Sequence, residues 1–138
     1  MTSVVLDASI TLGALCHDEQ NARCMAILEN AVKSSASVPP LWAIEVGNIL
    51  EVKHRQKRLS FEDVADIQAF IGGFEHWIDV DQPMQNALAA AALARKYTLT
   101  VYDAAYLELA LRINAPLATL DTALAKAARK AGVRVLPE

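Results

Sequence analysis

The sequence predicts an α/β fold in which a parallel sheet is covered by helices on both faces. Short apolar runs of strand length alternate with segments of helical periodicity along the whole chain. At 138 residues, with 54% hydrophobic and 21% charged residues, the chain has the composition of a compact globular protein and can bury a substantial core. No linker or internal repeat interrupts the alternation. We therefore expect one domain over residues 1–138.

Five apolar runs are the predicted strands, and each has the length of a buried strand. In chain order they are Ser3–Leu6, Ser37–Val38, Trp77–Val80, Pro116–Leu120 and Val133–Leu136. The carboxyl ends of parallel strands share one edge of a sheet, and ligands gather at that edge in folds of this class. Polar residues that follow these runs are therefore the first candidates for a functional site.

Seven segments between the strands carry helical periodicity or helix-start signals. In chain order they are Ala8–Leu15, Asp18–Lys33, Leu41–Lys57, Ser60–Phe74, Pro83–Lys96, Asp103–Asn114 and Thr122–Ala131. Asp18 and Ser60 are predicted N-caps, and Asp63 completes a capping box with Ser60. Gly72-Gly73 is expected to bend or end the fourth helix. Asn114 tolerates the left-handed position that ends the sixth.

Four acids lie at strand ends or beside apolar helix stripes: Asp7, Glu45, Asp103 and Asp121. Asp7 and Asp121 follow the first and fourth predicted strands, whereas Asp103 and Glu45 lie on or beside the apolar faces of their helices. Two carboxylates about 5 Å apart repel by roughly 3 kcal/mol at an effective dielectric constant of about 20. Four of them in one pocket would need cations to remain ionised.

The chemistry of this acidic set points to hard metal ions. Oxygen ligands without neighbouring Cys or His select Mg²⁺ or Mn²⁺ over Zn²⁺. A pair of such ions can ready a water for in-line attack on a phosphodiester and stabilise the leaving oxygen. Ser9, Asn48 and Thr119 are close enough in the sequence to hold the carboxylates from behind.

Each acid also has a structural interpretation. Asp7 and Asp121 are placed to cap the helices that follow them. Glu45 could pair with a buried cation, and Asp103 could complement the dipole of its helix. The pattern alone leaves both interpretations open.

Two basic groups are ambiguous in the same way. One is at the end of the third helix and consists of Lys53, His54, Arg55, Lys57 and Arg58; the other consists of Lys126, Arg129, Lys130 and Arg134. Either group could hold RNA phosphates or could be a solvated helix end that complements the helix dipole. The net charge of −3 does not by itself indicate a nucleic-acid-binding protein, although a local basic face can suffice.

The remaining features exclude several other kinds of site. Cys16 and Cys24 show no metal-ligand pattern and are expected to be free thiols in a reducing compartment. Ser9 lacks the Gly-x-Ser-x-Gly elbow of a nucleophile, and Gly72-Gly73 lacks the lysine of a P-loop. The chain starts without the basic region of a signal peptide, and its Ala-rich segment is too short to span a membrane. We expect a cytoplasmic protein with no membrane association.

Four motifs in order resemble the PIN-domain family, with the nearest similarity to VapC-type toxins of type II toxin–antitoxin pairs. They are Asp7-Ala-Ser9, Glu45-Val-Gly-Asn48, Tyr102-Asp103-Ala-Ala-Tyr106 and Pro116-Leu-Ala-Thr119-Leu-Asp121. The resemblance covers nearly the whole chain. It implies a three-layer α/β/α fold with a central, mostly parallel sheet.

The resemblance also implies an activity. It assigns Asp7, Glu45, Asp103 and Asp121 to the metal-binding positions of a Mg²⁺- or Mn²⁺-dependent endoribonuclease. Ser9 and Thr119 fall on supporting hydroxyl positions, and Asn48 on an amide position. A metal-activated water would hydrolyse RNA and leave a 5′-phosphate and a 3′-hydroxyl.

Two partners are further implied by the resemblance: a second copy of the chain in a homodimer, and a cognate antitoxin. The antitoxin's helix is expected in an apolar groove between the third and fourth helices, near Trp42, Leu50, Phe61, Phe70 and Phe74. The alternatives are a catalytically silent PIN-like binding or regulatory module and a different metal-dependent phosphotransfer fold.

Overall fold

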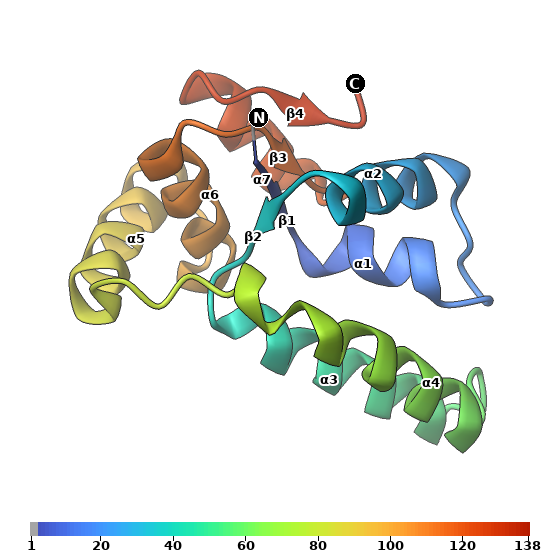
Figure 1. The fold of residues 1–138 in the computed structure, drawn as a ribbon. Helices are drawn as coiled ribbons and strands as arrows, with labels where there is room; N and C mark the ends of the chain where they lie inside the picture. Colours follow the sequence, from blue (N-terminus) through green and yellow to red (C-terminus); the bar gives the residue numbers. More distant parts are fainter. Residues whose placement is uncertain (1–2) are drawn as a thin grey trace.

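The computed structural model describes residues 3–138 and shows three layers, with helices on both faces of a central sheet (Figure 1). The elements are β1 (Val4–Leu6), α1 (Ala8–Leu15), α2 (Ala22–Lys33), β2 (Ala36–Ser37), α3 (Leu41–Arg55), α4 (Phe61–Ile71), the 3₁₀ helix η1 (Gly72–Trp77), α5 (Pro83–Tyr97), α6 (Val101–Ile113), β3 (Leu117–Ala118), α7 (Thr122–Lys130) and β4 (Val135–Leu136). The strands pair in parallel in the order β2-β1-β3-β4. This confirms the predicted α/β/α class.

The two central strands are buried on both faces. Val5 and Leu6 of β1 and Leu117 and Ala118 of β3 are each 0% exposed. Figure 1 shows α5 and α6 on one side of the sheet, α1 and α2 on the other, and α3 beside α4 as a long hairpin at one end. A strand that is covered on both faces is apolar at every position, so the sequences of β1 and β3 are continuously apolar and do not alternate between apolar and polar residues.

Several helix ends form as the capping residues predict. Ser60 and Asp63 make the reciprocal hydrogen bonds of a capping box at the start of α4. Asn114 ends α6 in the left-handed conformation, with φ of 53°. Gly132 follows α7 with φ of 84°, a conformation that glycine adopts without steric cost. These local signals fix where the chain turns back toward the sheet.

The predicted strand Trp77–Val80 is wrong. Trp77 is the last residue of η1, and only Ile78 makes a single parallel bridge, to Val38. The apolar run contributes to the core instead: Trp77 is 5% exposed and packs against Trp42, with ring centroids 6.4 Å apart. Short apolar runs cannot be assigned to strand or helix by periodicity alone.

The predicted limits of the second and third helices also need correction. Helix α2 begins after Asn21, whose side-chain oxygen accepts hydrogen bonds from the backbone N–H groups of Arg23 and Cys24. Asp18 is therefore not its cap. Helix α3 ends at Arg55, two residues early, and Lys57 then adopts φ of 61° in the turn to α4.

Two of the residues expected to line a groove between α3 and α4 are buried instead. Trp42 and Leu50 are 2% and 0% exposed and belong to the core. An apolar groove of about 300 Å³ lies instead against α1 and α2 and reaches Phe70 of α4. Its apolar wall is formed by Ala14, Leu15, Met25, Leu28 and Val32.

None of the helices in the described part of the chain has the length and hydropathy needed to span a bilayer.

Candidate active site

Asp7 lies between β1 and α1 and is 7% exposed. One carboxylate oxygen accepts a hydrogen bond from the backbone N–H of Ser9 at 2.7 Å, which caps α1. The other accepts a short hydrogen bond from the Thr119 hydroxyl. Burial raises the pKa of Asp7, while the hydrogen bonds from Thr119 and Ser9 act against this rise, and the charge of Asp121 adds to it. The chain thus holds a buried carboxylate in one orientation.

Three hydrogen bonds order the chain after β3, and one of them joins it to α1. The backbone N–H of Leu120 donates to the Ser9 hydroxyl at 3.0 Å, and that of Asp121 donates to the Thr119 hydroxyl at 3.0 Å. Asp121 in turn caps α7, accepting from the N–H of Leu124 at 2.8 Å. The carboxyl ends of β1 and β3 are neighbours in the sheet, so Asp7 and Asp121 meet at one edge.

Glu45 enters from the second turn of α3. One of its carboxylate oxygens accepts a hydrogen bond of 2.5 Å from the hydroxyl of Tyr106 in α6. Burial raises the pKa of Glu45; the Tyr106 hydrogen bond lowers it in part, and the charges of Asp7 and Asp103 raise it further. Tyr106 is 1% exposed, and its own pKa is raised by burial and by this bond, so it remains a protonated donor.

Asp103 lies in the first turn of α6, where Thr100 is the N-cap and accepts a hydrogen bond from the backbone N–H of Asp103 at 3.1 Å. Burial raises the pKa of Asp103, and the charges of Asp121 and Asp7 add to the rise. The charge of Asp121 thus acts on Asp7 and on Asp103, and the charges of Asp7 and Asp103 act on Glu45. We call these four residues the acidic site.

Among the supporting residues, Ser9 and Thr119 make hydrogen bonds at the acidic site, whereas the role of Asn48 stays a prediction. Asn48 is exposed, and within residues 3–138 no hydrogen bond joins its side chain to an acid. Tyr106 is the residue that sequence reasoning did not assign to the site. Its position three residues after Asp103, on the same helix face, was the available signal.

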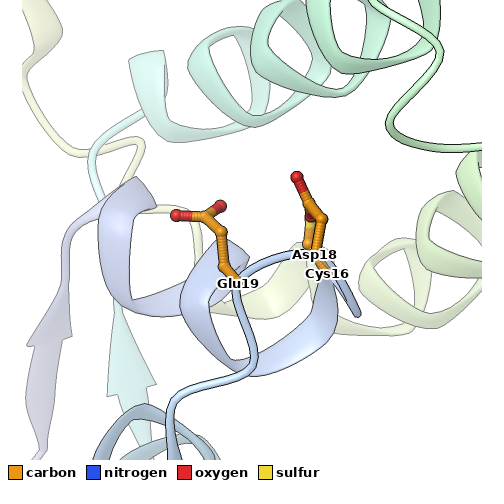
Figure 2. Close-up of side chains that lie close together, drawn as sticks. All are labelled: Cys16, Asp18 and Glu19. Atoms are coloured by element: carbon orange, nitrogen blue, oxygen red, sulfur yellow. The ribbon is translucent and has the colours of Figure 1, made fainter.

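A second acidic group lies outside this site and needs no ion. Cys16, Asp18 and Glu19 have ligand atoms within 4.8 Å of one another (Figure 2), and they are the one such trio of His, Cys, Asp or Glu in the described residues. Burial raises the pKa of the Cys16 thiol to about 11, so it is protonated at neutral pH. The two carboxylates already have a cationic partner.

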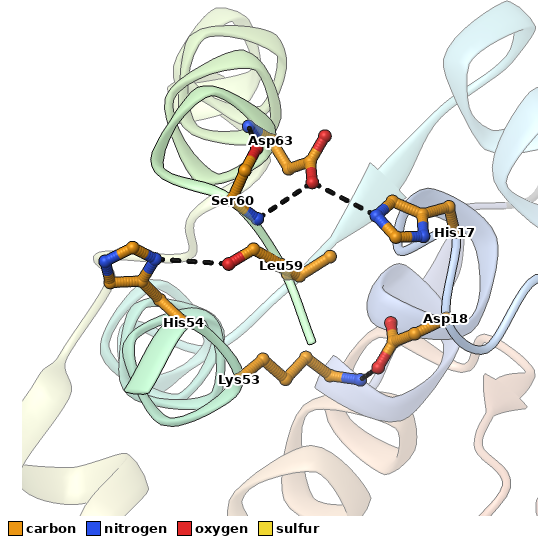
Figure 3. A network of polar contacts seen from close by, with 7 residues as sticks. All are labelled: His17, Asp18, Lys53, His54, Leu59, Ser60 and Asp63. Atoms are coloured by element: carbon orange, nitrogen blue, oxygen red, sulfur yellow. Dashed lines mark hydrogen bonds and ion pairs between the residues drawn. The ribbon is translucent and has the colours of Figure 1, made fainter. Parts of the chain in front are cut away.

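That partner is Lys53, which is 3% exposed. Its ammonium group lies 2.7 Å from both Asp18 and Glu19, and Arg58 lies 2.7 Å from Asp18. We call these four residues the Lys53 network. Figure 3 shows Lys53 reaching from α3 to Asp18, with the neighbouring contact of His17 to Asp63 at 3.0 Å. Lys53 is thus a buried, paired cation, whereas Arg58 is paired but 47% exposed.

The acids of the acidic site are more widely spaced than that trio, because no three of their oxygens lie within 4.8 Å of one another in residues 3–138. Mg²⁺ is usually held by one or two carboxylates and keeps several of its waters, so a wider spacing suits it. All four donors are carboxylates, which is the chemistry that hard divalent ions select.

Comparisons with known proteins agree with this architecture. The sequence profile of the PIN domain matches residues 4–130. Over 125 residues the chain is 31% identical to Ribonuclease VapC3 of Pyrobaculum aerophilum, which covers 89% of this chain and 92% of the relative.

Solved structures share the fold at lower identity. PAE2754 from Pyrobaculum aerophilum has a TM-score of 0.71 at 21% identity and covers 98% of this chain and 84% of its own. FitAcB from Neisseria gonorrhoeae has a TM-score of 0.64 at 15% identity and covers 96% and 95%. With the profile and the ribonuclease relative each covering most of its length, the chain belongs to the PIN-domain family.

Proposed function

We propose that this protein is a divalent-metal-dependent endoribonuclease that acts as the toxin of a toxin–antitoxin pair. The observation that carries the proposal is the convergence of four carboxylates, those of Asp7, Glu45, Asp103 and Asp121, near the carboxyl ends of β1 and β3. A protein keeps such a set of carboxylates together when a cation offsets their charge. The relation to Ribonuclease VapC3 supports RNA as the substrate.

The acidic site fits Mg²⁺ or Mn²⁺. Asp7, Glu45, Asp103 and Asp121 would hold one or two such ions, with Asp121 contacting an ion directly or through water. When bound, these ions supply a water of lowered pKa and offset the charge that develops on the phosphate. Cleavage would leave a 5′-phosphate and a 3′-hydroxyl.

The chain's own residues orient the ligands. Ser9 and Thr119 hold the two oxygens of Asp7. Tyr106 holds one oxygen of Glu45 and leaves the other free for an ion. Fixed ligands of this kind need no rearrangement during the reaction, which is how a preorganised site lowers a barrier.

An antitoxin is the proposed regulatory partner, in line with the resemblance to VapC-type toxins. The groove against α1, α2 and Phe70 is apolar and open, with Met25 38%, Val32 44% and Phe70 41% exposed. An amphipathic helix could lay its apolar face there. The groove replaces the one expected between α3 and α4.

We also propose a homodimer that acts in the cytoplasm, where an RNA substrate is present. A self-association surface is available around the start of α5, where Val80, Met84 and Leu88 are 72%, 72% and 66% exposed. Tyr102 at the start of α6 is 68% exposed and lines a pocket with Pro83 and Ala87 of α5. Size-exclusion chromatography with light scattering, on the unaltered chain and on Met84→Glu, tests this part.

RNA cleavage tests the proposal as a whole. Purified protein is incubated with a mixture of structured RNAs and Mg²⁺ or Mn²⁺, with a chelator arm and with Asp7→Asn as the control for contaminating nucleases. We expect metal-dependent cutting that disappears in the variant. If the unaltered protein cuts no RNA and is not toxic when expressed, the silent binding module is the correct interpretation.

A further inference from the structure

The positive charge of this chain is segregated. Residues 82–102 and 122–137 carry six cations and no acid, whereas the rest of the chain carries seven cations and all sixteen acids. Arg134 pairs with Glu138, so five of the six cations are without an ion pair in the described residues, and a protein with net charge −3 still has a basic region. The region is built from α5 with the turn that follows it, and from α7 with the segment after it.

The two basic segments meet at a hollow of about 400 Å³. On one side it is lined by the end of α5 and the turn after it, residues 96–99, and on the other by one face of α7. Three lysines line it: Lys96, Lys126 and Lys130. We call this the lysine hollow. All three side chains are exposed, and in the described part of the chain none of them makes an ion pair.

Many of the other cations are already neutralised. Lys53 and Arg58 belong to the Lys53 network, and Arg112 pairs with Asp79 and Glu108. The basic group at the end of α3 therefore keeps only Arg55 and Lys57 as cations without an ion pair in residues 3–138. Of the two basic groups in the sequence, the one that includes α7 retains more available charge.

The lysine hollow adjoins the acidic site. Asp121 caps α7, and Ala123 in the first turn of that helix already lines the hollow. Lys126 is five residues beyond Asp121, about 7 Å along the helix axis, and Lys130 is about 13 Å along it. On the other side, Leu99 lines the hollow four residues before Asp103. A chain that leaves the acidic site along this face of α7 would pass these lysines.

We propose that the lysine hollow binds backbone phosphates of single-stranded RNA beside the phosphate that is cleaved. This inference rests on the proposed function. Four carboxylates repel a polyanion, so a substrate strand needs cations close to them. Lysine ammonium groups supply such contacts without reading the base sequence. The hollow would hold the RNA strand beside Asp103 and Asp121, so that the phosphate to be cleaved lies at the acidic site.

The test measures RNA binding apart from cutting. Fluorescence anisotropy of a labelled single-stranded RNA of mixed sequence is followed in Mg²⁺ over a salt series, with the full chain carrying Asp7→Asn to stop cleavage. The test variant adds Lys126→Gln and Lys130→Gln. The matched control adds Arg55→Gln and Lys57→Gln, which remove the same charge at the end of α3.

Each phosphate neutralised on a single strand contributes about −0.7 to the slope of log affinity against log salt. The lysine pair should therefore flatten the slope by about 1.4, and Lys96→Gln alone by about 0.7. The control pair should leave the slope unchanged. Circular dichroism melting of each variant verifies that the fold is retained.

Three results would overturn the inference. The first is an equal salt slope for the lysine variant and the Asp7→Asn parent chain, and the second is an equal flattening of the slope in the lysine variant and in the Arg55/Lys57 control. The third is a parent chain that binds no RNA. The proposed function fails differently. If the parent binds RNA through the lysines but the unaltered protein never cuts it, the hollow stands and the nuclease does not.

Discussion

Asp7 is a helix cap and also the most enclosed member of the acidic site. Its hydrogen bond from Ser9 closes the first turn of α1, an interaction that typically stabilises a protein by about 1 kcal/mol. Its burial next to Asp121 acts in the opposite direction. The structural and functional interpretations of Asp7 are therefore compatible: the cap fixes the carboxylate where an ion would need it.

Asp103 offers a direct test of burial and repulsion, because both raise its pKa and only a hydrogen bond with Thr100 acts against them. In chelator at low salt, Asp103→Asn should raise the free energy of unfolding by about 0.5–1 kcal/mol, a value reduced for solvent screening. Urea denaturation measures it. Asp66→Asn, an exposed aspartate on α4, is the matched control and should change nothing. A less stable Asp103→Asn would assign Asp103 a structural role.

The same burial and repulsion predict a pH dependence. Folding raises the pKa of Asp103 above its ordinary value of 3.8, so the folded state binds this proton more tightly than the unfolded state. The resulting destabilisation is absent below that value and develops as pH rises through the folded-state pKa. In chelator, the advantage of Asp103→Asn over the unaltered chain should therefore be larger at neutral pH than at a pH close to 3.8. An advantage that is constant with pH would contradict this origin.

Tyr106 is a positioning residue for Glu45, and Tyr106→Phe tests it. The hydroxyl lowers the pKa of Glu45, so its removal should raise that pKa further and shift the acid limb of the pH profile of RNA cleavage to higher pH. Loss of the hydrogen bond should also cost about 1 kcal/mol of stability. Tyr102→Phe, at an exposed tyrosine on the same helix, is the control. An unmoved acid limb would leave Tyr106 with a packing role only.

At the scale of elements, local signals predicted what depends on one turn of chain. The sequence predicts α1 with the limits that the structure has, Ala8–Leu15, because an apolar strand, a capping Asp and a helical stretch follow one another directly. Asp18 was misread as a cap because its partner, Lys53, is 35 residues away. The two side chains meet only when α3 packs against α1. Capping signals in the sequence carry no information about such a competitor.

The Lys53 network joins the α1–α2 connection to the end of α3, and Lys53→Met should break it. Removal of the ammonium group would leave Asp18, whose side chain is 14% exposed, with Arg58 as its remaining cation. Removing one partner of a buried pair typically costs about 3 kcal/mol. Arg134→Gln, which opens the exposed pair with Glu138, should cost nearly nothing. Comparable urea midpoints for the two variants would show that the network adds little to stability.

At the scale of the whole molecule, the sequence predicts the acids of the site better than it predicts the residues that hold them in place. Asp7 and Asp121 follow neighbouring parallel strands, so topology alone brings them to one edge. The bond between Tyr106 and Glu45 spans 61 residues and depends on how α3 and α6 pack, which periodicity does not specify. Asn48 lies one turn after Glu45 on α3 and is exposed, and in residues 3–138 no hydrogen bond joins its side chain to an acid, so its supporting role stays a prediction.

Metal binding should couple the acidic site to the stability of the whole fold. An ion that binds only the folded chain stabilises it by about 2.7 kcal/mol at a hundred times its dissociation constant. Mn²⁺ should therefore raise the melting temperature of the unaltered protein, and much less that of the Asp7→Asn/Asp103→Asn double variant, each compared with its own chelator sample. Glu19→Gln separates the two acidic groups, since Glu19 belongs to the Lys53 network. A Mn²⁺ shift lost in Glu19→Gln and kept in the double variant would move the ion to Cys16, Asp18 and Glu19, and would remove the physical basis for the proposed nuclease.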